Sequence, residues 1–211
     1  MFTGLIEEVG ELRRTSPLAN GRRLFVACRT VLEGMTVGDS LSVNGVCQTV
    51  TQVAADGVWF EAVGDTLTKT TLSELLPGEP VNLERACRAD SRFGGHFVLG
   101  HVEAVERILD WSPRGDAWNL EVSLAPRFRR YVIAEGSVAV DGISLTVAEL
   151  TDRGFRISVI PHTRATTRLA KVAAGAPVNL EVDILAKYVE SMLAPGTRGL
   201  DDQMLKKWGY V

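Results

Sequence analysis

The sequence predicts an all-β protein built from two similar barrels and a helical tail. The first observation is an internal repeat. A shift of 97 positions aligns residues 38–84 with 135–181, and 15 of these 47 pairs are identical. Two copies of so long a period indicate two domain-sized units rather than a solenoid of short repeats. The second observation is a series of short alternating segments with glycine punctuation, which favours closed barrels without exposed sheet edges.

The repeated segments contain the clearest strand signals. Asn44-Gly45 and Asp141-Gly142 each separate two alternating apolar runs, so residues 41–51 and 138–149 are predicted hairpins. Period and β-propensity predict further strands at residues 2–9, 24–28, 58–63, 81–85, 98–105, 120–124, 155–160 and 178–182. Short helices or single turns are expected at residues 30–33, 70–75, 127–133 and 167–172, with the seam between the units near residues 86–92.

The tail lies outside both repeats. Apolar residues at spacings of three and four from Ile184 to Leu193 predict one amphipathic helix, which Pro195-Gly196 ends. A short second helix is expected within residues 200–208. The apolar face of the first helix has two interpretations: packing against its own barrel, or an oligomer contact. We favour the oligomer contact, because two self-sufficient barrels leave this helix nothing obvious to cover.

Composition narrows the function classes. The net charge of −3 and the pI near 5.7 give no basic footprint, so we expect no nucleic-acid partner. Three cysteines without a CxxC pair indicate neither a disulfide framework nor a zinc site. We find no signal peptide, no apolar run long enough to span a bilayer and no glycine-rich phosphate loop. These observations predict a cytoplasmic protein without membrane contact.

The polar positions at which the repeats differ are the candidates for chemistry. Cys47 corresponds to Ser144, and Leu5 corresponds to His101 at a shift of 96. Taken singly, each has a plain structural interpretation, and hairpin turns alone explain Asn44 and Asp141. His96 and His101 would point to opposite faces if they lay on one strand, so they form a poor metal pair. The residues themselves therefore predict a duplicated barrel with two small-molecule pockets and no metal.

Motifs along the whole chain resemble the riboflavin synthase alpha chain family. They are MFTGLIE at the start, VNGVCQTV and VDGISLTV in the repeats, GGHFVLGH, IPHT and VNLEVDILAKYVE. The resemblance implies two six-stranded Greek-key barrels and a C-terminal helix that joins subunits into a homotrimer. The implied domains are residues 1–88, 89–183 and 184–211.

The resemblance also implies the reaction. Two molecules of 6,7-dimethyl-8-ribityllumazine exchange a four-carbon unit and give riboflavin and 5-amino-6-ribitylamino-pyrimidinedione, without a cofactor. One lumazine would lie in the N-terminal barrel of one subunit, and the other in the C-terminal barrel of a neighbour. Lumazine synthase is a further partner to consider. The alternative from the same lineage is a non-catalytic, antenna-type protein that holds a lumazine or a flavin.

Site residues carried over by motif fall into two groups. The implied N-terminal pocket contains Gly4, Leu5, Ile6, Cys47, Gln48, Thr49, Glu61, Ala62, Val63, Gly64, Asp65 and Thr66. The implied C-terminal pocket contains Gly100, His101, Val102, Ser144, Leu145, Thr146, Ile160, Pro161, His162, Thr163, Arg164 and Ala165. The catalytic candidates are Ser144, His101, Cys47 and Asp141.

A few positions depart from the family pattern. Glu135 stands near the expected substrate where the family commonly has Lys, and Arg129 or Arg130 could replace that cation. Gln48, Arg164 and Arg168 also differ from the usual residues. These changes are expected to tune binding of the ribityl chain, while the Cys, Ser and His positions are kept.

Overall fold

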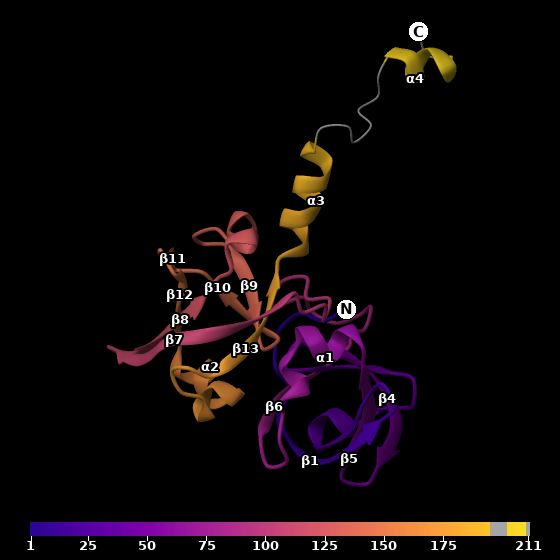
Figure 1. Cartoon of the computed structure of the whole chain (residues 1–211), viewed down its shortest axis with the longest axis vertical. Helices are drawn as coiled ribbons and strands as arrows, with labels where there is room; N and C mark the ends of the chain where they lie inside the picture. The colour runs from indigo at the N-terminus through magenta and orange to yellow at the C-terminus, as the bar shows by residue number, and fades with distance from the viewer. Residues whose placement is uncertain (195–201, 210–211) are drawn as a thin grey trace.

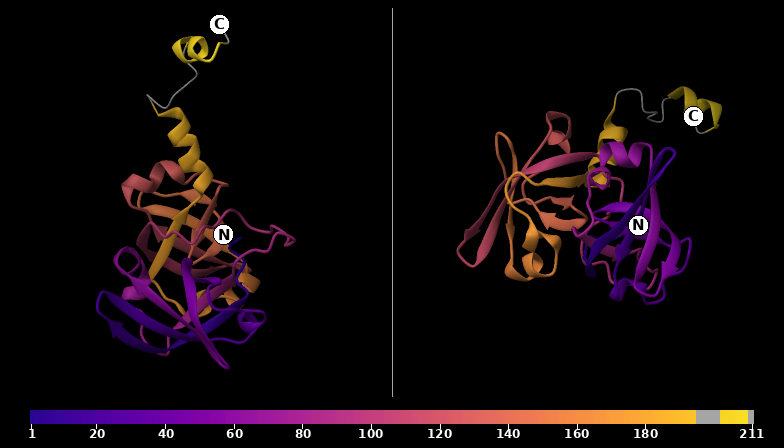
Figure 2. Two further views of the ribbon diagram at one scale, coloured as in Figure 1. Left: turned by 90° about the vertical axis from the view of Figure 1, so that its right-hand side faces the viewer. Right: turned by 60° about the horizontal axis from the view of Figure 1, so that its bottom comes forward.

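Two β-units lie side by side, and a helix projects from the second (Figure 1). The computed structural model describes residues 1–194 and 202–209. Two further views show the same two units with α3 (Ile184–Leu193) projecting from the second (Figure 2). No helix in these described ranges is both long and apolar enough to cross a membrane.

The N-terminal unit is a closed barrel of six antiparallel strands in the order β1-β2-β5-β4-β3-β6. Buried leucine, valine and phenylalanine side chains from all six strands fill its core. Three short helical segments connect the strands. The strands are β1 (Glu8–Leu18), β2 (Gly21–Ala27), β3 (Ser40–Val43), β4 (Val46–Ala54), β5 (Gly57–Val63) and β6 (Pro80–Arg85). The helical segments are α1 (Asp65–Lys69) and the 3-10 helices Thr30–Leu32 and Thr71–Ser73.

The C-terminal unit repeats this arrangement as a curled sheet in the order β10-β9-β13-β7-β8-β12-β11. A core like that of the first unit fills its interior. Its strands are β7 (Ala104–Arg114), β8 (Ala117–Ser123), β9 (Ser137–Val140), β10 (Ile143–Thr146), β11 (Glu149–Leu150), β12 (Gly154–Val159) and β13 (Pro177–Val182). The helical segments are α2 (Pro161–Ala165) and the 3-10 helices Pro126–Tyr131 and Arg168–Lys171.

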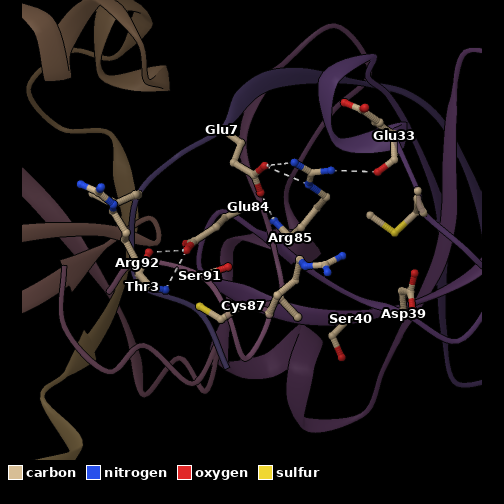
Figure 3. Close-up of a pocket in the computed structure, with 15 residues that line it drawn as sticks. Thr3, Glu7, Glu33, Asp39, Ser40, Glu84, Arg85, Cys87, Ser91 and Arg92 are labelled. Carbon is tan, nitrogen blue, oxygen red and sulfur yellow. Dashed lines mark hydrogen bonds and ion pairs between the residues drawn. The ribbon is translucent and has the colours of Figure 1, made fainter. Parts of the chain in front are cut away.

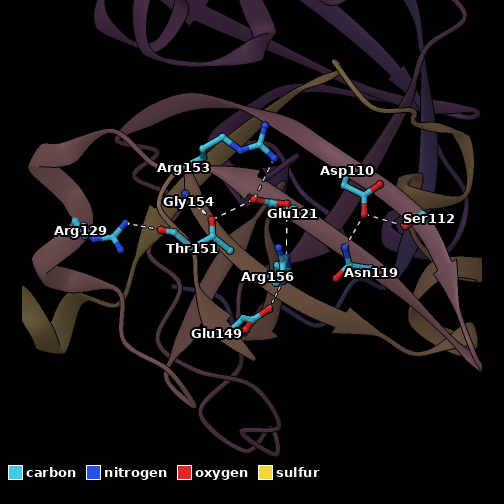
Figure 4. Close-up of polar contacts among 10 residues, drawn as sticks. All are labelled: Asp110, Ser112, Asn119, Glu121, Arg129, Glu149, Thr151, Arg153, Gly154 and Arg156. Atoms are coloured by element: carbon cyan, nitrogen blue, oxygen red, sulfur yellow. Dashed lines mark hydrogen bonds and ion pairs between the residues drawn. The ribbon is translucent and has the colours of Figure 1, made fainter.

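One strand of the first barrel is divided in the second unit. By the 97-residue shift, β10 and β11 together correspond to β4, and the interruption falls at Val147-Ala148. Beyond it, side chains hold the short edge strand, because Arg156 forms ion pairs with Glu149 and with the buried Glu121 (Figure 4). The expected all-β fold of two related units is confirmed, and the second unit is a curled sheet of seven strands in place of the expected six, because of this break.

The two turn dipeptides form as predicted. Asn44 and Asp141 have φ values of 48° and 47°, and the following glycines have φ values of 77° and 76°. This left-handed pair is the geometry of a type I′ hairpin, which favours Asn-Gly and Asp-Gly. The sequence expectation was wrong at residues 2–9 and 98–105, since β1 starts at Glu8 and β7 at Ala104. Before those points, Phe2 and Val98 form a single bridge with each other. The helices α1 and α2 were not expected.

The two turns also meet between the units. The Asn82 amide donates to the Asp141 carbonyl (2.9 Å), and the Asn179 amide donates to the Asn44 carbonyl (2.7 Å). A Cβ on Gly45 would lie 2.6 Å from the Gly142 nitrogen, so the close approach of the turns requires glycine. Reciprocal bonds of this kind fix the relative orientation of the barrels through groups that are buried on both sides.

The tail begins with α3 (Ile184–Leu193), as predicted, and α4 (Asp202–Lys207) follows within the expected second helix. The expected stop at Pro195-Gly196 lies outside the described residues. Ion pairs of Lys187 with Glu103 and of Glu190 with Arg130 hold α3 against the second unit. No side chain of α3 is buried, and five of its apolar residues are exposed: Leu185, Tyr188, Val189, Met192 and Leu193.

A buried carboxyl group at the end of β13 holds the segment that precedes β7. Glu181 accepts hydrogen bonds from the backbone nitrogens of Leu99 (2.6 Å) and Gly100 (3.0 Å). Burial raises the pKa of Glu181 from 4.5 to about 7, although these N–H groups favour the charged form. Glu84 makes the equivalent contacts to Thr3 and Gly4.

The raised pKa of Glu181 predicts a pH-dependent stability. The folded protein keeps the Glu181 proton up to about pH 7, whereas the unfolded chain releases it near the ordinary value of 4.5. The folded state therefore binds more protons between these values, and the Glu181 contribution to the free energy of unfolding falls as pH rises through them. In urea unfolding at pH 5 and pH 7, Glu181→Gln should remove this component. Glu11→Gln, at an exposed ion pair, should keep it. Equal pH dependence in wild type and Glu181→Gln would contradict the assignment.

Candidate functional site

Each repeat sends its leading segment onto the other barrel. The Gly4 carbonyl accepts a hydrogen bond from the Ser144 nitrogen (2.8 Å), and the Gly100 carbonyl accepts one from the Cys47 nitrogen (2.9 Å). The following apolar side chains confirm the exchange, because Ile6 packs on the C-terminal core and Val102 on the N-terminal core. The predicted grouping is therefore corrected: residues 4–6 belong with Ser144, and residues 100–102 belong with Cys47.

Glycine is required at both crossing points. Gly4 and Gly100 have φ values of 78° and 80°, in the left-handed region. A Cβ on Gly4 would lie 2.6 Å from the Ser144 Cβ, and one on Gly100 would lie 2.5 Å from the Cys47 Cβ. Only residues without a side chain allow the exchanged segments to approach the strands this closely.

The N-terminal face is formed by the side chains of β4 and β5 that point away from the core. Val50 pairs with Phe60 inside the barrel, so the alternating neighbours Thr49 and Glu61 are exposed. Val63 is 51% exposed at the end of β5, and His101 is exposed on the exchanged segment. Next to them Cys47 is half-buried against a small cluster between the barrels. The exposed side chains of this face are both apolar and polar.

The C-terminal face has the same arrangement with different side chains. Thr146 and Ile160 take the places of Thr49 and Val63, and both are exposed. Ser144 replaces Cys47, and Leu5 takes the place of His101 with 51% of its surface exposed. Large apolar side chains exposed at equivalent places on both faces are typical of surfaces that a ligand or a partner covers.

The structure pairs Ser144 with a histidine that sequence analysis did not select. The Nδ1 atom of His96 lies 2.7 Å from the Ser144 hydroxyl oxygen. His96 is buried, its Nε2 has no partner among the described residues, and burial lowers its pKa. A neutral imidazole in hydrogen-bond contact with a hydroxyl group can accept or return its proton. The sequence did contain one signal for this site, the pair Gly94-Gly95 directly before His96. The structure explains the second glycine, because a Cβ on Gly95 would lie 1.9 Å from the Thr3 carbonyl oxygen and 3.0 Å from the Ser144 Cβ.

Asp141 has a different place from the one expected for a catalytic residue. Its side chain is fully buried in the hairpin between the barrels. One carboxylate oxygen accepts from the Asn179 nitrogen (2.8 Å), and the other is ion-paired with Arg168 (2.6 Å). Burial raises the pKa of Asp141, while Arg168 opposes this shift. These contacts make Asp141 and Arg168 part of the junction between the barrels.

The remaining predicted residues lie in the barrel cores, beside Cys47, or in and next to the short helices α1 and α2. Ala62 and Leu145 point into the cores, and the buried Gln48 donates to the Cys47 carbonyl (2.8 Å). Gly64 precedes α1, whose Asp65 is ion-paired with Lys69 and whose Thr66 carbonyl accepts a hydrogen bond from the Thr70 hydroxyl (2.6 Å). The others form α2: Pro161, His162, Thr163, Arg164 and Ala165. Its Thr163 carbonyl accepts the equivalent hydrogen bond from the Thr167 hydroxyl (2.7 Å).

The structure also shows the contacts of the residues at which this sequence differs from the family pattern, and of the two arginines suggested as replacements. The Arg164 guanidinium stacks on Trp118, 4.1 Å from the ring centre. Glu135 is exposed in a turn with a φ value of 65°. The two suggested replacement cations are both engaged, because Arg129 donates to the Thr151 carbonyl (2.8 Å) and Arg130 is paired with Glu190.

A cavity of about 510 Å³ lies beside the exchanged N-terminal segment (Figure 3). It is lined by residues of the first unit and of the chain that follows β6: Thr3, Leu5, Glu7, Glu33, Gly34, Met35, Asp39, Ser40, Glu84, Arg85, Ala86, Cys87, Arg88, Ser91 and Arg92. Of the residues in the two predicted pockets it includes Leu5, and neither Cys47 nor Ser144 lines it. Across residues 1–194 and 202–209 we find no group of three or more His, Cys, Asp or Glu side chains that could hold a metal ion.

Comparison with known proteins agrees with the duplicated site. Residues 3–86 and 99–183 match the lumazine binding domain family. Riboflavin synthase from Mycobacterium bovis is 43% identical, over 92% of this chain and 98% of that protein. The enzyme from Bacillus subtilis is 36% identical, over 98% of this chain and 96% of that protein. The fold resembles LumP complexed with riboflavin, with a TM-score of 0.81 and 24% identity over 86% of this chain and 99% of that one. The chain therefore belongs to the riboflavin synthase family, with one lumazine binding domain in each half.

Proposed function

We propose that this chain is a riboflavin synthase, a transferase that converts two molecules of 6,7-dimethyl-8-ribityllumazine into riboflavin and 5-amino-6-ribitylamino-pyrimidinedione. The observation that carries the proposal is the pair of equivalent faces, which differ mainly in Cys47 against Ser144 and His101 against Leu5. A reaction between two molecules of one compound needs two related sites that treat their ligands differently. The identity to riboflavin synthases over both repeats supports the same reaction.

The proposed reaction asks the protein for positioning and proton transfer. A four-carbon unit passes from one lumazine to the other, and the two products together contain all the atoms of the two substrates. No oxidant or reductant is consumed. Holding two reactants in the correct orientation can lower the activation barrier of the reaction by on the order of 7–11 kcal/mol, relative to two molecules that meet in solution. The threonine hydroxyls Thr49 and Thr146, at matching places, are suited to bind the ring edges of the two lumazines.

The two faces have unequal roles in this proposal. On the C-terminal face Ser144, with His96 behind it, serves as nucleophile or proton relay for one lumazine. On the N-terminal face Cys47 and His101 contact the other lumazine, and the His101 side chain is exposed there. Asp141 supports these groups indirectly, by holding the junction to which both Cys47 and Ser144 are attached.

We also propose a homotrimer in which the N-terminal face of one subunit meets the C-terminal face of a neighbour. The exposed apolar side of α3 supports an assembly contact, since Leu185, Tyr188 and Val189 are each more than half exposed. The large apolar side chains exposed on both faces, Val63 and Ile160, support their completion by a second subunit. A cytoplasmic location fits the three free cysteines. Association with lumazine synthase would place the enzyme next to the source of its substrate.

The first test is turnover itself. Purified protein should form riboflavin from 6,7-dimethyl-8-ribityllumazine alone, with EDTA present and no nucleotide added, and riboflavin fluorescence should rise with time. Chromatography should find one pyrimidinedione for each riboflavin. Binding of the lumazine without turnover would instead identify an antenna-type protein, and activity that is lost on chelation and restored by a metal would contradict the proposed chemistry.

The second test separates the roles of the site residues. Ser144→Ala and His96→Gln should each lower kcat by about 100-fold or more, because both remove a group that moves a proton in the transition state. Thr49→Ala should mainly raise KM, because uniform binding is lost. Urea unfolding controls for stability. Near-normal kcat in both Ser144→Ala and His96→Gln would show that this pair takes no part in the reaction.

The third test concerns assembly. Deleting the chain after Asp183 should separate the subunits and leave both β-units folded, because no side chain of α3 is buried in either core. Light scattering should then report monomers, and circular dichroism should retain the β-signal. A deletion after Leu193, which keeps α3, is the matched control and should remain trimeric. An intact trimer after the longer deletion would refute the assembly proposal.

A further inference from the structure

Two equivalent carboxyl groups hold the exchanged segments in place. Glu7 follows the first segment and Glu103 follows the second, at the 96-residue shift. The Glu7 nitrogen donates to the Leu83 carbonyl (2.9 Å), and the Glu103 nitrogen donates to the Leu180 carbonyl (2.9 Å). Both carboxylates thus occupy matching places beside the last strand of their own unit.

Each carboxylate also accepts a backbone N–H from the end of that strand. The Arg85 nitrogen donates to Glu7 (2.6 Å), and the Val182 nitrogen donates to Glu103 (3.0 Å). Arg85 and Val182 are equivalent by the 97-residue shift. One N–H leaves most of the negative charge uncompensated, so the source of the positive charge decides how firmly each carboxylate is held.

The two halves obtain that positive charge from different parts of the chain. In the first unit the Arg85 side chain supplies it, with its Nε 2.9 Å from Glu7 and a further bond to the Glu33 carbonyl (Figure 3). Val182 carries no charge, and the cation that reaches Glu103 is Lys187, from α3. The side chain of Glu103 is only 14% exposed, so losing this partner would leave a poorly solvated carboxylate.

Glu103 is joined directly to the segment at the N-terminal face. Val102 packs on the N-terminal core, His101 is exposed beside that face, and the Gly100 carbonyl accepts from the Cys47 nitrogen. The other end of the connection is equally defined, because Glu190 of α3 accepts a hydrogen bond from Tyr131 and pairs with Arg130. An unbroken series of contacts therefore connects α3 with His101.

We infer that Lys187 and Glu103 are positioning residues: their ion pair couples the placement of α3 to the placement of His101 at the N-terminal face. The inference rests on the proposed function, in which that face binds one lumazine and α3 mediates assembly. The first unit needs no such coupling, since Arg85 closes the equivalent contact within the barrel. The same helix that joins subunits would then also set the geometry of the site that a neighbour completes.

The test uses the full chain and the NMR signals of its imidazoles. The sequence has three histidines, so His96, His101 and His162 can be assigned from single glutamine variants. Lys187→Met and Glu103→Gln should each shift the His101 signals and leave those of His162 unchanged, and Lys187→Arg should restore the wild-type position. Arg13→Met, which breaks the exposed pair with Glu11, is the control and should move none of them. Unchanged His101 signals in both Lys187→Met and Glu103→Gln would overturn the inference.

Kinetics and light scattering separate this inference from the proposals on which it rests. In Lys187→Met, light scattering should still report the wild-type oligomer, while kcat falls about tenfold or more because a misplaced group loses its alignment. Lys187→Arg should recover most of that loss. If the wild type forms no riboflavin, the proposed function fails, and the His101 signals still decide the coupling. If the wild type is active and Lys187→Met matches it in kcat and in His101 signals, only the coupling fails.

Discussion

The exchange of leading segments between the barrels is the constraint on which the rest of the structure depends. Two backbone hydrogen bonds, from Ser144 to Gly4 and from Cys47 to Gly100, attach each segment to the barrel of the other repeat. Two buried carboxyl groups, those of Glu84 and Glu181, hold the same segments to their own barrels. Each segment is thus fixed from both sides, and the barrels cannot separate without exposing buried polar groups, which is costly.

This constraint also explains how a duplicated chain acquires two unlike sites. The residues that complete each face come from different repeats, so a change in one repeat alters both faces at once. Leu5 completes the face of Ser144, and His101 completes the face of Cys47. The Ser144 hydroxyl on β10 and the Cys47 thiol on β4 therefore have different neighbouring side chains. The asymmetry extends to the tail, where Lys187 of α3 supplies a charge that Arg85 supplies in the first half.

Local sequence patterns predicted the parts of the fold that depend on local forces. Asn44-Gly45 and Asp141-Gly142 identified the hairpins, because a type I′ turn requires left-handed residues wherever it occurs. The spacing of apolar residues identified α3 in the same way. The repeat itself identified Cys47 and Ser144 as equivalent positions with different chemistry.

Long-range contacts account for what the sequence did not reveal. Residues 2–9 were predicted to form a strand, yet Glu84 accepts hydrogen bonds from the N–H groups of Thr3 and Gly4 that a strand would donate to its neighbour. Nothing in a local pattern tells which barrel such a segment will join, so Leu5 and His101 were assigned to the wrong partners. His96 was passed over because its role depends on a contact with Ser144, 48 positions away. The five-residue helices α1 and α2 are too short to show a helical period.

The exchange is the central claim, and double-mutant cycles on kcat/KM test it most directly. Leu5→Ala and Ser144→Ala should show a coupling energy of about 0.5 kcal/mol or more, because residues that share a site are not additive. Leu5→Ala and Cys47→Ser should be additive within about 0.5 kcal/mol, because they act on different ligands. Coupling of Leu5 to Cys47, with additivity between Leu5 and Ser144, would contradict the exchange and return Leu5 to the N-terminal site.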